Sequence, residues 1–117
     1  MSGQLPHRNA IDKHLSALAE GDEEFKRELI GIYTNYMIEI PREFARFTLN
    51  KQQEELGLLQ HRHKTTCHVL ALEELSETFT EARTILKGNH STNVAINELI
   101  NKVNSICNTT LYQLKDI

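Results

Sequence analysis

The sequence predicts an all-α protein, an antiparallel four-helix bundle of up-down-up-down topology with a short additional helix at its N-terminus. Only two prolines and five glycines interrupt the 117 residues. Apolar residues recur at spacings of three and four along four long segments, which is the pattern of helices with one buried face. Short connections between these segments make successive helices antiparallel neighbours. We expect residues 1–117 to form a single domain, since this length supports one core.

The first element is a short helix over residues 9–19. Asn9 is a possible N-cap, and Gly21 follows the helix as the residue that closes it. We expect this helix to lie across one end of the bundle as a lid, outside the core.

The second element begins after Asp22, a good N-cap residue, and its apolar positions predict one buried stripe. These positions are Phe25, Leu29, Ile32, Tyr33, Tyr36, Met37 and Ile40. Pro41 interrupts the helical hydrogen bonding, but Phe44 and Phe47 continue the apolar spacing. The segment is therefore either one kinked helix or two abutting helices that reach Asn50.

Three further segments complete the bundle. The third has Leu56, Leu59, His63, Thr66 and Leu70 on one helical line, the fourth has Leu72, Leu75, Phe79, Ala82 and Leu86, and the last has Ile96, Ile100, Val103, Cys107, Thr110 and Leu114. Lys87 and Gly88 predict the end of the fourth helix, with Gly88 in a left-handed cap. We expect residues 89–91 to form the loop before the last helix.

The stretch from Gln60 to His68 is the most unusual in the chain, because it is rich in ionisable and hydroxyl side chains. At about 100° per residue, the face opposite the buried line of the third helix carries five residues. These are Gly57, His61, Lys64, Thr65 and His68. The spacing thus predicts that His61 is exposed at the middle of a helix.

An exposed imidazole one turn from a lysine is a plausible phosphoryl acceptor. Neutral imidazole is a nucleophile near pH 7, and the Lys64 ammonium can offset the incoming negative charge. Gly57, one turn before His61, leaves room for the active site of another protein. The alternative is that His61 is one more solvated surface histidine, because this spacing is not specific.

From about Asp22 to the C-terminus the chain resembles histidine-containing phosphotransfer (HPt) domains. Their pattern His-x-Leu-Lys-Gly-Ser has a counterpart in register at residues 61–66, which read His-Arg-His-Lys-Thr-Thr. The resemblance implies a phosphorelay protein of two-component signalling, with His61 as phosphoacceptor and Lys64 assisting. It implies response-regulator receiver domains or a hybrid sensor histidine kinase as partners, and Mg²⁺ on the receiver. Gly57, Thr65 and His68 would contact the partner.

The chain departs from the family pattern at two positions. His63 stands where the family has leucine, and we expect it to be buried with a hydrogen-bond partner and to accept no phosphate. Thr65 stands where the family has glycine, on the surface that would dock a receiver. This leaves open a degenerate version of the domain, which binds a receiver or another signalling protein without phosphotransfer.

Other functions are less well supported by the residues. A zinc or copper site could draw on His61, His63, Cys67, His68 and His90, but the spacing places these side chains on different faces, and we expect no metal. The sequence has no motif of a self-sufficient enzyme: it lacks a phosphate-binding loop, a nucleophile elbow and a recognisable acid-base pair. We therefore expect a phosphocarrier that holds no cofactor of its own. A helical interaction module without chemistry is the remaining alternative.

Charge and hydropathy limit the partners and the location. The formal net charge is -3, with 13 basic and 16 acidic residues. The sequence has no cluster of basic residues of the kind that binds nucleic acid or anionic lipid. The chain has no apolar run long enough for a membrane span and no apolar leader. We therefore expect a cytoplasmic monomer in which Cys67 and Cys107 are reduced and partly buried.

Overall fold

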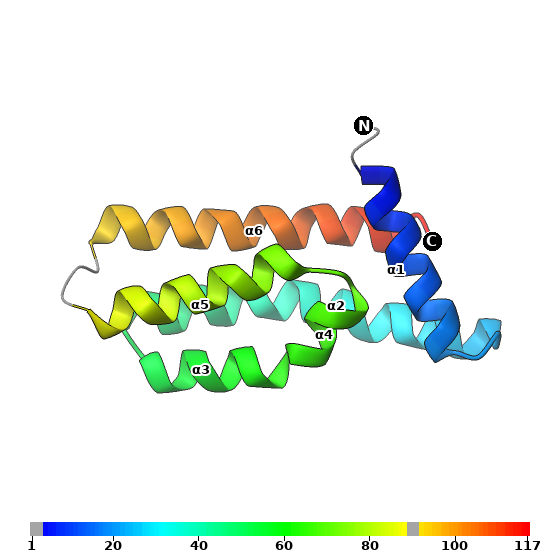
Figure 1. Cartoon of the computed structure of the whole chain (residues 1–117), viewed down its shortest axis with the longest axis horizontal. Helices are drawn as coiled ribbons and strands as arrows, with labels where there is room; N and C mark the ends of the chain where they lie inside the picture. Colours follow the sequence, from blue (N-terminus) through cyan, green and yellow to red (C-terminus); the bar gives the residue numbers. More distant parts are fainter. Residues whose placement is uncertain (1–3, 89–91) are drawn as a thin grey trace.

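The computed structural model describes residues 4–88 and 92–117, and every regular element in them is a helix (Figure 1). The helices are α1 (Gln4–Leu18), α2 (Glu23–Leu49), α3 (Gln53–Arg62), α4 (Lys64–Val69), α5 (Glu73–Lys87) and α6 (Asn93–Lys115). The predicted all-α class is confirmed. Within these residues, no helix combines the length and the apolar character that crossing a bilayer requires. The predicted loop at residues 89–91 lies outside the described residues.

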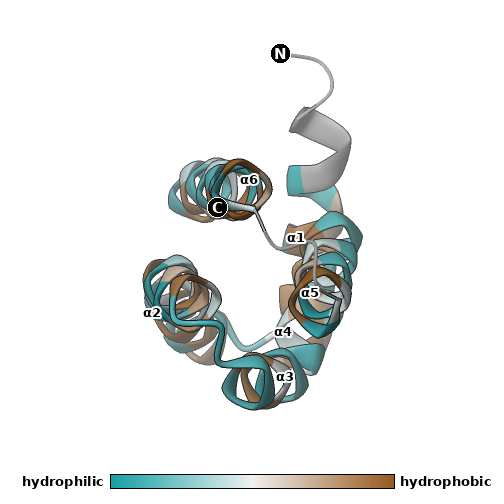
Figure 2. Cartoon of the chain, turned by 90° about the vertical axis from the view of Figure 1, so that its left-hand side faces the viewer, coloured by the Kyte–Doolittle hydropathy of each residue, from teal (hydrophilic) through white to brown (hydrophobic). Residues whose placement is uncertain are grey.

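Four of the helices lie around a common core, as the end-on view in Figure 2 shows. Helix α2 contacts α6 and α3, and α5 contacts the same two helices from the other side. The short α4 continues from α3 toward α5, and α1 lies across one end, in contact with α2, α4 and α6. One contiguous hydrophobic cluster takes side chains from all of these helices.

Helix α1 differs from its prediction in where it begins and in what it buries. It starts at Gln4, so Asn9 lies inside the helix and does not cap it. Proline is tolerated in a first turn, where backbone N–H groups have no intrahelical partner, so Pro6 does not delay the start. Ile11 and Leu15 are fully buried, and α1 is therefore part of the core and not a lid. Gly21 follows the helix with φ of +83°, in the left-handed region that favours glycine.

Helix α2 begins where the sequence predicts. The Asp22 carboxylate accepts hydrogen bonds from the backbone N–H groups of Glu24 and Phe25, which satisfies donors that have no intrahelical partner. The helix runs unbroken through Pro41 to Leu49, so of the two predicted alternatives the structure has one helix and not two abutting helices.

The predicted buried stripe of α2 is correct only in the C-terminal part of the helix. Met37, Ile40 and Phe44 are fully buried, but Phe25 and Ile32 are 42% and 44% exposed. Figure 1 shows the reason, since the N-terminal part of α2 extends past the ends of α3 and α5. Apolar spacing marks a face, but only a neighbouring element can bury it.

The third predicted helix is divided at His63. Helix α3 ends at Arg62 and α4 starts at Lys64, while His63 adopts φ of -101° and ψ of 18° between them. All five positions of the predicted apolar line are nevertheless buried, and they are Leu56, Leu59, His63, Thr66 and Leu70. The break therefore changes the direction of the chain without removing this line from the core.

The last two helices agree with the predicted segments except at one cap. Gly88 follows α5 with φ of -87° and ψ of 175°, which is extended backbone and not the predicted left-handed cap. The Thr92 hydroxyl accepts a hydrogen bond from the backbone N–H of Ala95 and caps α6. Phe44 of α2 and Phe79 of α5 meet edge to face in the core, with ring centroids 5.3 Å apart.

Candidate functional site

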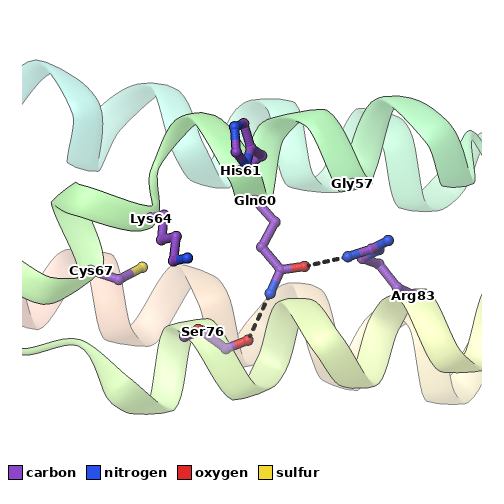
Figure 3. A pocket seen from close by; sticks show the side chains of 7 residues that line it. All are labelled: Gly57, Gln60, His61, Lys64, Cys67, Ser76 and Arg83. Carbon is purple, nitrogen blue, oxygen red and sulfur yellow. Dashed lines mark hydrogen bonds between the residues drawn. The ribbon is translucent and has the colours of Figure 1, made fainter.

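His61 lies on the surface at the C-terminal end of α3. It is the next-to-last residue of that helix, so the prediction of a mid-helix position is wrong, although the side chain is exposed as expected. The helix break follows two residues later. Figure 3 shows the ribbon turning between His61 and Lys64, so the imidazole lies at a corner of the fold where α3 ends and α4 begins.

A groove between α3 and α5 begins at this corner, and we call it the His61 groove. Its lining residues are Gly57, Gln60, His61, Lys64, Cys67, Ser76 and Arg83 (Figure 3). In Figure 3 the Lys64 side chain extends toward α5, while the His61 ring stays beside α3. The structure thus brings together Gly57, His61 and Lys64 of the predicted site.

Two other predicted residues lie outside the groove lining. Thr65 is exposed on α4, immediately after Lys64. His68 is also exposed, but it lines a different hollow beside α1, where its ring stacks on that of His14. The change of direction at His63 explains this, because α4 runs on into contact with α1 and carries His68 away from the groove.

A polar network crosses the groove from α3 to α5. The Gln60 side-chain amide donates to the Thr80 hydroxyl at 3.1 Å and to the Ser76 carbonyl at 3.4 Å. The Arg83 guanidinium in turn donates to the Gln60 side-chain oxygen at 3.0 Å. This network links the two helices between which the groove lies.

Gly57 leaves room for a neighbouring side chain of the protein itself. A Cβ atom at this position would lie 3.3 Å from the guanidinium of Arg83, so the missing side chain makes room for Arg83. Gln60, Cys67, Ser76 and Arg83 were absent from the predicted site. Three of these four are on α4 or α5, and no local sequence pattern links them to His61.

The His61 groove favours an anion. Lys64 and Arg83 are cationic, and His61 carries at most a positive charge. Among the described side chains that line the groove, none is acidic. In a chain of net charge -3, this local excess of positive charge is the feature that a phosphoryl group would require.

His63 is buried, as predicted, and is 1% exposed. Its Nδ1 lies 3.2 Å from the Thr66 hydroxyl, its ring meets that of Tyr36 edge to face, and its Nε2 lies 3.8 Å from the Glu39 carboxylate. Burial lowers the pKa of His63 below its ordinary value of 6.5. The Glu39 carboxylate opposes this shift, and the Arg62 charge adds to it.

Replacing His63 with leucine is expected to keep or raise the free energy of unfolding at neutral pH, by about 0 to 2 kcal/mol. Leucine removes a buried nitrogen that lacks a hydrogen-bond partner, a cost of roughly 1–3 kcal/mol. Because the folded pKa is lowered, the unfolded chain takes up the proton first as pH falls below 6.5, so wild-type stability falls there. Urea unfolding between pH 5 and 8 should show a shallower pH dependence in the variant. A steeper dependence would contradict this assignment.

Both cysteines are free thiols. Cys107 is fully buried, and burial raises its pKa to about 12, with Cys67 adding to the shift. Cys67 is half-buried in the His61 groove, where burial raises its pKa to about 11. Both thiols are therefore neutral at pH 7, and Cys67 contributes no negative charge to the groove.

Within residues 4–88 and 92–117, no three or more His, Cys, Asp or Glu side chains are grouped to hold a metal ion. His90, one residue of the alternative metal site, lies outside the described residues.

Comparison with known proteins gives no relative: no family model, no curated protein and no solved structure matches the chain.

Proposed function

We propose that this protein is a phosphocarrier of the histidine-containing phosphotransfer kind, which accepts a phosphoryl group on His61 and passes it to a second receiver domain. The observation that carries the proposal is the position of an exposed imidazole at the mouth of a groove with Lys64 and Arg83 and no acidic lining residue. The sequence resemblance over residues 61–66 supports it independently.

The fold proposed with this function is an up-down-up-down four-helix bundle in which α3 and α4 together form the third helix. The ring of contacts among α2, α3, α5 and α6 supports this arrangement, with α1 added at one end. Such a bundle supplies a rigid base, and a rigid base matters because phosphoryl transfer depends mainly on positioning and electrostatics.

In the proposed reaction, a receiver domain that carries an aspartyl phosphate and Mg²⁺ docks over α3 and α4. The unprotonated nitrogen of the His61 imidazole attacks phosphorus in line. A nitrogen–phosphorus bond forms as the phosphorus–oxygen bond of the acyl phosphate breaks, and its electron pair returns to the receiver carboxylate. Lys64 neutralises charge on the transferring oxygens, and the groove requires no nucleotide.

The direct test is incubation of the purified protein with a phosphorylated receiver domain, followed by analysis of the labelled product. Acid-labile, base-stable phosphate on His61 is the expected result. Binding of the receiver without phosphohistidine would instead favour the degenerate, binding-only version of the domain. Thr65 is the feature that favours this second candidate, because an exposed β-branched side chain stands beside Lys64 where the family has glycine.

Replacing Lys64 with alanine is expected to slow phosphate transfer but not to abolish it. The lost charge should raise the barrier by roughly 1–3 kcal/mol, the scale of a hydrogen bond to a charged group, which is about 5- to 150-fold in rate. Mg²⁺ and receiver groups partly duplicate its effect. Single-turnover transfer from a phosphorylated receiver measures this rate. Lys51→Ala, an exposed lysine outside the groove, is the matched control and should transfer at the wild-type rate.

A further inference from the structure

A pair of histidines lies where α1 meets α4, on a surface separate from the His61 groove. The His14 and His68 rings are nearly parallel, with an angle of 11° between their planes and centroids 6.0 Å apart. They are 54 positions apart in sequence, so only the docking of α1 against α4 brings them together. With Ala17, Leu18 and Val69 they line a shallow hollow.

The tautomer of His14 is determined by its hydrogen bond. Its Nδ1 lies 2.9 Å from the backbone carbonyl oxygen of Val69, and a carbonyl can only accept, so Nδ1 carries the hydrogen and donates it. The lone pair of neutral His14 is therefore on Nε2. A ring N–H held by a backbone carbonyl is the usual support of a metal-binding histidine, because it fixes the ring and makes the other nitrogen a better ligand.

The 6.0 Å between the ring centroids lets two imidazoles reach one ion once the His68 ring turns out of its stack on His14. With a metal–nitrogen distance of about 2.1 Å and a tetrahedral or wider angle at the metal, the two ring centroids lie roughly 5–6 Å apart. His68 is exposed, so small rotations of its side chain can direct a nitrogen to the same point.

From this geometry we propose that His14 and His68 form a binding site for a divalent transition-metal ion of the zinc class, which links α1 to α4. Two imidazole ligands suit zinc and its neighbours and do not suit Mg²⁺ or Ca²⁺. Water molecules complete the coordination. The site does not depend on the phosphorelay function, and it acts on the fold by holding the N-terminal helix in place.

The test is a titration of the full chain with Zn²⁺ at pH 7.5, followed by NMR of the histidine ring protons and by amide hydrogen exchange. The ring signals of His14 and His68 should shift together and saturate at one zinc per chain, and exchange in α1 should slow. Mg²⁺ at the same concentration should change neither. His14→Gln and His68→Gln should each remove the saturable shift, while His61→Gln and Cys67→Ala should retain it.

These variants also separate loss of the site from loss of the fold. Glutamine at position 14 can still donate to the Val69 carbonyl, and position 68 is exposed, so α1 should remain docked in both variants. Saturable binding that survives either substitution would overturn the proposal. So would zinc shifts that affect the isolated His61 ring as strongly as the pair.

Discussion

Replacing His61 with glutamine is expected to abolish phosphate incorporation and to leave the fold intact. His61 supplies the proposed nucleophilic atom, and the buried ring of His63 cannot replace it because it is 1% exposed. The substitution should reduce phosphate incorporation to background, since no other residue that lines the groove has an imidazole side chain. Incubation with a phosphorylated receiver and measurement of acid-labile phosphate per chain gives the result.

The matched control for this experiment is His68→Gln, which alters an exposed histidine on the neighbouring helix. That variant should still incorporate phosphate, because His68 lines the hollow beside α1 and not the His61 groove. Both substitutions are on the surface and should change the free energy of unfolding by no more than about 0.5 kcal/mol. Full incorporation by the His61 variant would show that the acceptor is another residue.

The buried positions of this fold are largely readable from the sequence, because helical periodicity is a local property. Leu75, Phe79 and Ala82 on α5, like Val103 and Cys107 on α6, were expected in the core and are fully buried. The exposed Phe25 shows the limit of this reasoning. Its apolar neighbours at helical spacing predict a buried face, but whether a face is covered depends on the lengths of other helices.

The geometry around His61 was less predictable, because the helix is interrupted at a single residue and changes direction there. No proline or glycine in the stretch 58–70 signals a break, yet the helix stops at Arg62 and restarts at Lys64. His63 occupies the break, buried against Tyr36 and near Glu39. These contacts come from α2, so a rotation of 100° per residue along one segment could not include them. His68 was therefore assigned to the His61 face although it lies beside α1.

The cationic character of the groove depends on contacts between distant segments. Arg83 is 22 positions after His61 and reaches the site only because α5 lies beside α3. The sequence predicts that Gly57 leaves space for a partner beside His61, but the Arg83 guanidinium lies against that space. The spacing along one helix predicts the candidate nucleophile and the nearby lysine, whereas the second cation is brought to them only by the tertiary structure.

The largest expected effect on stability is that of Phe79→Ala, which should lower the free energy of unfolding by about 3–5 kcal/mol. Phe79 is fully buried, and its ring meets that of Phe44 edge to face at 85°. The substitution removes apolar burial, leaves a cavity that a close-packed core cannot fully close, and deletes the aromatic pair, itself worth roughly 0.5–1.5 kcal/mol. Because Phe44 is on α2 and Phe79 on α5, the loss weakens the attachment of the helix that carries Arg83.

Urea unfolding of wild type, Phe79→Ala, Phe44→Ala and the double variant measures both the cost and the coupling. The losses of unfolding free energy in the two single variants should add up to more than the loss in the double variant. The difference is the energy of the ring pair, because the two rings are in contact and their effects are not additive. Tyr112→Ala is the matched control, because Tyr112 is 80% exposed and its loss should change stability by no more than about 0.5 kcal/mol. A cost below about 1 kcal/mol for Phe79→Ala would mean that α5 does not pack on α2 through this ring.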